Sequence, residues 1–153
     1  MRLLTHNMLS SNIKGVTNGF PLRIEVQKVI EKPVDFNPDF LRHMFPMIDW
    51  NALVEASRTM GYPDLPDSAD AAMLDSDDFL QRFHHSLLEL HLEEGALLCP
   101  ETGRRFPVTK GIPNMLLHED EVEVSGARAP GKLSGIALFV LSLLPLHFFS
   151  HLQ

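Results

Sequence analysis

The sequence CPETGRRFPVTKGIPNMLL, residues 99–117, decides the fold. A cysteine before a tight turn at residues 100–103, followed by two short strands, predicts a hairpin with the shape of a zinc-ribbon knuckle. A working knuckle needs Cys-x-x-Cys and a second pair of ligands elsewhere, so that four side chains surround one tetrahedral ion. Here the second position is Thr102, and Cys99 is the only cysteine in the chain. The sequence therefore predicts the hairpin without the metal site, which indicates a scaffold used for its surface.

Size and charge narrow the class of protein. The chain has 153 residues, of which 44% are hydrophobic, and this predicts one domain with a core of its own. The net charge of −7 argues against broad binding to a phosphate backbone, which needs clustered Lys and Arg. A single cysteine excludes an intramolecular disulfide framework and fits a reducing compartment. The first residues lack the apolar run of a signal peptide.

Strand patterns lie towards both ends of the folded region, and helix patterns lie between them. Alternation of apolar and polar residues at 22–27 predicts a half-buried strand. Residues 88–93 alternate in the same way, and Glu94-Gly95 predicts a turn into a further strand at residues 96–99. We therefore predict an α+β fold, in which a zinc-ribbon-like antiparallel sheet from both chain ends carries an inserted helical subdomain.

Capping signals place three helices in the predicted insertion. Asn37, Asp49 and Ser76 are each suited to the N-cap position, because their side-chain oxygens accept from free backbone N–H groups. Pro46 ends the first helix, and Gly61 occupies the place of a C-cap glycine after the second.

No group of residues has the composition of a catalytic site. Cys99 as a nucleophile needs an activating histidine and an oxyanion site, and the sequence places neither. As a metal ligand it needs three partners, and the adjacent His84 and His85 point about 100° apart on a helix. The Asp-rich stretch 64–78 lacks the regular order of calcium ligands and predicts a solvated loop.

Two surface features leave alternatives open. Arg104, Arg105 and Lys110 form a small basic spot, which is either a contact for RNA phosphates or a set of charges on a hairpin face. Residues 112–117 are apolar and begin an edge strand, because a proline is excluded from a sheet interior. Such an edge is covered either by a helix of the same chain or by the strand of a partner.

Three stretches of the chain resemble a known family. They are Leu4-Thr5-His6-Asn7-Met8-Leu9, Phe36-Asn37-Pro38-Asp39-Phe40, and the knuckle at 99–103 with Lys110-Gly111-Ile112-Pro113-Asn114-Met115-Leu116-Leu117. In order and in register, over about residues 1–122, they resemble the multifunctional methyltransferase subunit, also called the tRNA methyltransferase activator subunit, of the zinc-ribbon-like class.

The resemblance implies a function without catalysis. Members of the family activate and stabilise S-adenosylmethionine-dependent methyltransferases that act on tRNA, rRNA and the translation release factor. They form heterodimers with these catalytic subunits, which bind the S-adenosylmethionine, so RNA contact is at most indirect. Contact runs largely through a strand that extends the partner's sheet. The matching interface residues here are Ile112, Pro113, Asn114, Met115, Leu116 and Leu117.

The resemblance also implies a zinc position that has degenerated in this chain. Some members bind zinc through four cysteines, two near the start and two in the knuckle. The corresponding positions are Ser11, Val16, Cys99 and Thr102, so three of the four ligands are missing. We therefore expect no metal and no cofactor.

The predicted domains divide the chain into four parts. Residues 1–35 with 88–122 form the β domain, 36–87 the helical insertion, 123–132 a linker, and 133–153 an apolar tail without a charged residue. The tail departs from the family, and its length is sufficient for a C-terminal membrane anchor. Ser, Gly, Pro and His residues within it weigh against an anchor.

Three hypotheses of function follow. The first is a methyltransferase activator of the cytoplasm and nucleus. The second is an RNA-binding zinc-ribbon relative, which the acidic charge argues against. The third is a tail-anchored membrane adaptor, which depends wholly on residues 133–153.

Overall fold

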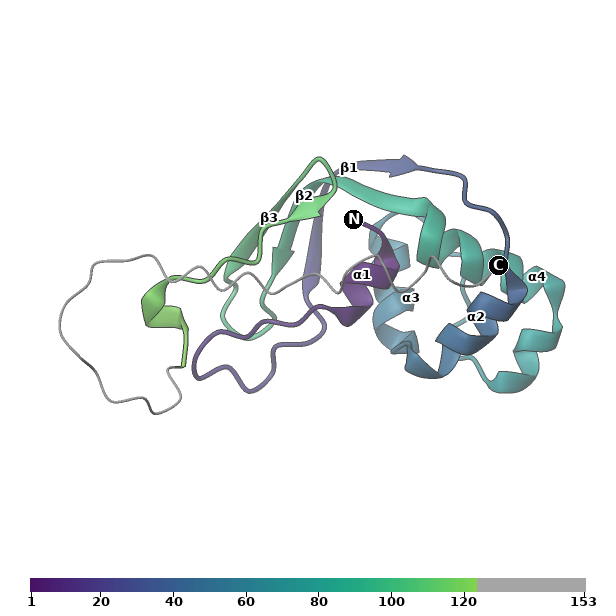
Figure 1. Ribbon diagram of the computed structural model, residues 1–153, viewed down its shortest axis with the longest axis horizontal. Coiled ribbons are helices and arrows are strands. Elements are labelled where there is room, and N and C mark those ends of the chain that lie inside the picture. The colour runs from purple at the N-terminus through teal and green to yellow at the C-terminus, as the bar shows by residue number, and fades with distance from the viewer. Residues whose placement is uncertain (124–153) are drawn as a thin grey trace.

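The computed structural model describes residues 1–123. All of the predicted linker except Glu123, and the whole predicted tail, lie outside these residues. One antiparallel sheet runs through the centre of the molecule, and the helices gather at one of its ends (Figure 1). Within residues 1–123, no helix is long and apolar enough to cross a bilayer.

The sheet confirms the prediction that both ends of the fold meet. Its strands lie in the order β1 (Arg23–Glu31), β2 (Leu90–Leu98), β3 (Arg105–Thr109) and β4 (Ile112–Pro113). The pairing of β1 with β2 brings Arg23 opposite Leu98 and Glu31 opposite Leu90. Both outer strands, β1 and β4, therefore have one open edge within the described part of the chain.

The helical part consists of short elements packed around an aromatic core. Its main helices are α2 (Pro38–Met44), α3 (Trp50–Thr59) and α4 (Asp77–His84), with shorter turns η1 (Phe45–Met47), η2 (Ala71–Asp75) and η3 (His85–Glu89). All three predicted N-caps are confirmed, since Asn37, Asp49 and Ser76 each accept from a backbone N–H three residues on. Phe45, Trp50, Phe79 and Phe83 meet with ring centroids 5.5–6.5 Å apart.

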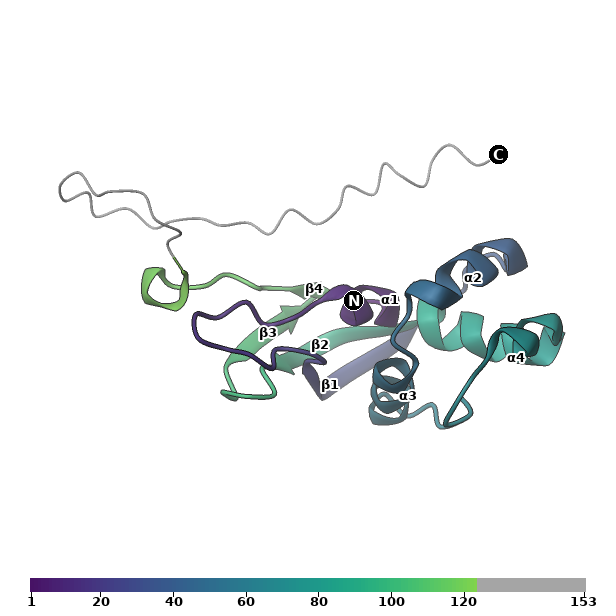
Figure 2. The same ribbon diagram turned by 90° about the horizontal axis from the view of Figure 1, so that it is seen from below.

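A first helix, α1 (Leu3–Met8), lies beside the sheet and joins it to α3 (Figures 1 and 2). Leu3 is fully buried, and the Asn7 side chain is hydrogen-bonded to both the N–H and the carbonyl of Asp49 at 2.9 Å. The sequence pattern did not indicate this helix, because six residues are too few to show a helical period.

The predicted strand at residues 88–93 is wrong in its first two residues, and the predicted turn at Glu94-Gly95 is wrong. Residues 88 and 89 belong to the π-helical turn η3, which continues the buried apolar stripe of α4. From Leu90 to Leu98 the chain is one continuous strand. Gly95 lies inside this strand. The position requires glycine, because a Cβ there would collide with the Glu25 carbonyl oxygen of β1. The glycine permits a close approach between strands and makes no turn.

Strand β1 also departs from the expected half-buried alternation. Leu22, just before it, is buried and Ile24 is half-buried, but Val26 is 38% exposed. Register shifts on both sides of Lys28 interrupt the pairing with β2, and such bulges re-aim the side chains next to them.

Candidate partner-binding site

The knuckle hairpin forms as predicted. After β2 the chain turns at residues 99–104, where the Cys99 N–H donates to the Arg104 carbonyl and the Gly103 N–H donates to the Cys99 carbonyl, both at 2.9 Å. Gly103 has a φ of 74°, which favours glycine. The second turn, Lys110-Gly111, has positive φ at both residues and joins β3 to β4 as a tight hairpin.

The four positions of the degenerate zinc site gather at the knuckle. Ser11 is buried and Thr102 is exposed, and both hydroxyls are hydrogen-bonding neighbours of the Cys99 thiol. Val16 belongs to the same corner, because the next residue, Thr17, donates to the Glu101 carboxylate from both its N–H and its hydroxyl.

The chemistry of this corner does not suit zinc. One buried thiol has two hydroxyls as its polar side-chain neighbours, whereas a structural site needs four thiolate or imidazole ligands. Burial raises the pKa of Cys99, but hydrogen bonds from Ser11, Thr102 and the knuckle backbone outweigh it, and the net pKa is lowered. Across residues 1–123, no three His, Cys, Asp or Glu side chains are placed to hold an ion.

The histidines that the sequence offered as ligands have structural contacts. The imidazole of His84 contacts the Val34 carbonyl at 2.9 Å, and that of His85 contacts the Glu89 carboxylate at 3.0 Å. Glu89 also accepts from the Val34 N–H at 3.0 Å. Together these contacts fasten the chain after β1 to the end of the helical part. The sequence did not predict these contacts, because Val34 lies about fifty residues from His84 and Glu89.

The basic spot is largely neutralised by carboxylates. Arg105 pairs with Glu25 at 2.7 Å, and Arg104 pairs with Glu121. The backbone N–H of Lys110 donates to Glu94. These contacts support the interpretation of hairpin-face charges over that of an RNA phosphate site.

The apolar segment 112–117 forms an extended outer edge beside β3. Only Ile112 and Pro113 pair as β4, and the chain continues without regular structure to the turn η4 (Glu119–Glu121). Along the segment exposed and half-buried residues alternate, as in a strand. Ile112 is 66% and Leu116 45% exposed, whereas Met115 and Leu117 pack against the core.

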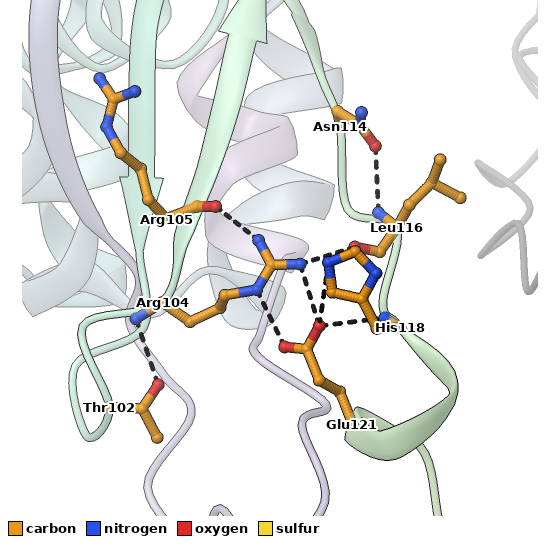
Figure 3. Close-up of polar contacts among 7 residues, drawn as sticks. All are labelled: Thr102, Arg104, Arg105, Asn114, Leu116, His118 and Glu121. Carbon is orange, nitrogen blue, oxygen red and sulfur yellow. Dashed lines mark hydrogen bonds and ion pairs between the residues drawn. The ribbon is translucent and has the colours of Figure 1, made fainter.

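Arg104 ties this segment to the knuckle (Figure 3). Its Nε and Nη2 donate to the two carboxylate oxygens of Glu121 at 2.9 and 3.1 Å. The same Nη2 donates to the Leu116 carbonyl at 3.1 Å, and Nη1 donates to the Arg105 carbonyl at 2.7 Å. The guanidinium also lies 4.9 Å from the ring centroid of Phe106. We call this set of contacts the Arg104 clasp.

Glu121 is held as a carboxylate by the clasp. Its Oε1 accepts from the His118 N–H at 3.0 Å as well as from Arg104. The hydrogen bond from Arg104, and then that from the His118 backbone, lower the pKa of Glu121 to about 2. The carbonyl of Glu121 accepts from the Lys14 N–H at 2.6 Å, which joins the loop near the start of the chain to the same corner.

The fold and this edge define a class: a zinc-ribbon-like domain with a helical insertion, a degenerate ligand set and an apolar edge strand that residues 1–123 leave open. The family described as Trm112p-like protein matches over residues 2–111. The chain belongs to this family, as the resemblance of its motifs indicated.

Relatives across eukaryotes carry the same description. The multifunctional methyltransferase subunit TRM112 homolog A of Arabidopsis thaliana is 75% identical over 124 residues, which cover 80% of this chain and all of the relative. The TRM112-like protein of Mus musculus is 48% identical, with 80% of this chain and 99% of the relative covered. The TRM112 subunit of Saccharomyces cerevisiae is 29% identical, with 76% of this chain and 96% of the relative covered.

A solved structure shares the fold. It is the E. cuniculi Mtq2-Trm112 complex, described as responsible for methylation of the eRF1 translation termination factor. The matched chain has a TM-score of 0.50 and 21% sequence identity, with 82% of this chain and 100% of that chain covered. At this identity the match concerns the fold.

Proposed function

We propose that this protein is a non-catalytic subunit that activates and stabilises S-adenosylmethionine-dependent methyltransferases acting on tRNA, rRNA and the translation release factor. The observation that carries the proposal is the 75% identity to a multifunctional methyltransferase subunit over that relative's whole length. The partners are the catalytic subunits, bound as heterodimers. Such partners fit a protein of the cytoplasm and nucleus, where these RNAs and the release factor are methylated.

The proposed interface is the outer edge at residues 112–117. Its two exposed apolar side chains, Ile112 and Leu116, lie on one face of the segment, and an uncovered apolar edge favours pairing with another strand. Met115 and Leu117 point to the opposite face and support the segment from the core. Leu116 is therefore the partner-facing residue of the pair Met115 and Leu116.

Binding alone is sufficient for the stabilising part of the proposed role. A subunit that binds the folded partner and not its unfolded chain stabilises the folded state by mass action. The same pairing covers the apolar edge at residues 112–117 of this chain, and an open edge of this kind otherwise favours aggregation.

The absence of catalysis is part of the proposal. The cavity beside β1 and α3, lined by His6, Arg23, Glu55 and neighbouring residues, has a volume of about 190 Å³. Sites for small molecules and cofactors usually have about 300–1,000 Å³. The sequence also has no glycine-rich turn between a strand and a helix, such as a nucleotide site requires.

The test is co-expression of the full chain with an Mtq2-type methyltransferase subunit, followed by co-purification and a release-factor methylation assay. We expect a heterodimer and activity that needs both chains. Calorimetry of the isolated protein should show no binding of S-adenosylmethionine. Recovery of RNA without any methyltransferase would support the RNA-binding alternative instead.

Two neighbouring substitutions sharpen this test. Leu116→Asp should weaken the complex at least about a hundredfold, because a buried unpaired charge costs about 3 kcal/mol or more. The melting temperature of the isolated Leu116→Asp protein should stay near that of wild type, since Leu116 is 45% exposed. Met115→Asp should instead lower the melting temperature of the isolated protein. Wild-type affinity of both variants would contradict the proposed edge.

A further inference from the structure

The backbone of segment 112–117 has two different edges. In an antiparallel hairpin, successive residues turn their N–H and C=O groups alternately towards the neighbouring strand and away from it. Thr109 pairs with Ile112 across the two-residue turn, and the Asn114 N–H donates to the Pro107 carbonyl at 2.9 Å. The backbone N–H and C=O groups of residues 112 and 114 therefore point towards β3, and the carbonyl of Pro113 points away from it.

The Arg104 clasp extends this alternation beyond the end of β4. The Leu116 carbonyl is turned towards the body of the protein, where Arg104 Nη2 donates to it. The Leu116 N–H donates to the Asn114 side chain at 3.1 Å. Both backbone groups of Leu116 are thus satisfied internally, as Figure 3 shows.

By the same alternation, Met115 and Leu117 turn their backbone groups to the open side. Neither residue forms a backbone hydrogen bond to another residue in the described part of the chain. Pro113 adds an outward carbonyl and, being proline, no N–H. The open edge therefore offers the carbonyl of Pro113 and complete N–H and C=O pairs at Met115 and Leu117.

From this geometry, and resting on the proposed function, we propose that Arg104 is a positioning residue for partner binding. It holds residues 114–117 extended, so that the partner strand pairs with the backbone of Met115 and Leu117 and not with that of Leu116. The side chain of Leu116 then packs against the partner, while its backbone stays bound to Arg104.

Arginine is suited to this task in a way that lysine is not. In the clasp, Nε and Nη2 of Arg104 donate together to the Glu121 carboxylate, and Nη2 also donates to the Leu116 carbonyl. Nη1 donates to the Arg105 carbonyl, and the flat guanidinium lies over the Phe106 ring. A lysine keeps the charge but cannot make these contacts together. Without them the segment must be ordered during binding, which reduces affinity.

The first experiment is amide hydrogen exchange of the full chain, alone and bound to the Mtq2-type subunit. We expect the amides of Met115 and Leu117 to become protected at least about tenfold on binding, since strand pairing closes them to water. The Leu116 amide should change far less. New protection at Leu116 with none at Met115 and Leu117, or equal changes at all three, would overturn the proposed register.

The second experiment compares Arg104→Lys with Arg105→Lys, which makes the same exchange at a neighbouring arginine whose side chain pairs, within residues 1–123, only with the exposed Glu25. We expect Arg104→Lys to weaken the complex about tenfold through loss of pre-organisation, and Arg105→Lys to leave it unchanged. In the free Arg104→Lys protein, amides at 114–121 should exchange faster while those of β2 and β3 stay protected. That local change separates positioning from a general loss of stability.

Wild-type affinity of Arg104→Lys would overturn the role of Arg104, as would a loss of affinity with uniform loss of protection across the sheet. If wild-type protein forms no complex at all, the proposed function itself fails. The two failures are therefore distinguishable.

Discussion

At the scale of single residues, Arg104 has the most demanding set of contacts in the partner-binding site. One side chain reaches a carboxylate 17 positions away, two carbonyls and an aromatic ring. The sequence presented it as one of three charges on a hairpin face. The sequence did not predict the contacts of Arg104, because Glu121 reaches the knuckle only through the path that the chain takes after β4.

The clasp predicts a pH-dependent contribution to stability from Glu121. Its pKa is lowered from 4.5 to about 2 in the folded protein, so its contribution is complete above pH 4.5 and is lost as pH falls towards 2. We expect Glu121→Gln to cost about 1 kcal/mol at pH 6 and progressively less between pH 4.5 and 2. Urea unfolding of both proteins across this range measures the difference.

The control for this prediction is a double-mutant cycle with Arg104→Gln. Because the two side chains bind each other, the double variant should cost less than the sum of the two single variants and little more than Arg104→Gln alone. A cost of Glu121→Gln that stayed constant from pH 6 to pH 2 would contradict the role of its ionised form.

At the scale of elements, the short helix α1 and the start of α3 stabilise each other through one amide. Asn7 is buried and satisfies both backbone groups of Asp49, which itself caps α3. Neither helix is long, and helices of this length depend on tertiary contacts.

Replacing this amide should loosen the junction between α1 and α3. We expect Asn7→Ala to lower the free energy of unfolding by about 2 kcal/mol, because it leaves the Asp49 N–H and carbonyl without their partner. The matched control, Asn12→Ala, removes an exposed amide and should cost less than about 0.5 kcal/mol. Chemical denaturation measures both, and equal costs would show that the junction does not depend on Asn7.

At the scale of the whole molecule, hydrogen bonds join the corner that contains the degenerate ligand positions to the rest of the fold. The loop before β1 is attached to the knuckle through Thr17 and Glu101, and to the turn η4 through Lys14 and Glu121. The buried Cys99 lies within this corner as a small packed thiol.

We therefore expect the purified full chain to contain no stoichiometric zinc by elemental analysis. The triple variant Ser11→Cys, Val16→Cys, Thr102→Cys, which restores four thiols with Cys99, should take up about one zinc per chain. About one zinc in the wild-type protein would contradict the degenerate site and would require histidines to complete it.

The sequence by itself determined what local chemistry can determine. Capping oxygens at Asn37, Asp49 and Ser76 located the helices, because a cap acts within three residues. The knuckle hairpin was also evident without coordinates, and the resemblance to the family supplied the four ligand positions, three of which lack a thiol. The apolar edge at residues 112–117 followed from its apolar side chains together with Pro113, because proline is excluded from a sheet interior.

Tertiary structure decided everything that depends on contacts between distant residues. Gly95 proved to be a point of close approach to Glu25, and only the neighbouring strand distinguishes that role from a turn. That the Leu116 side chain and not that of Met115 points outwards follows from packing, since Met115 lies against the core and Leu116 is 45% exposed. A period of two says that neighbours face opposite ways, but the core must be present to say which way is inwards.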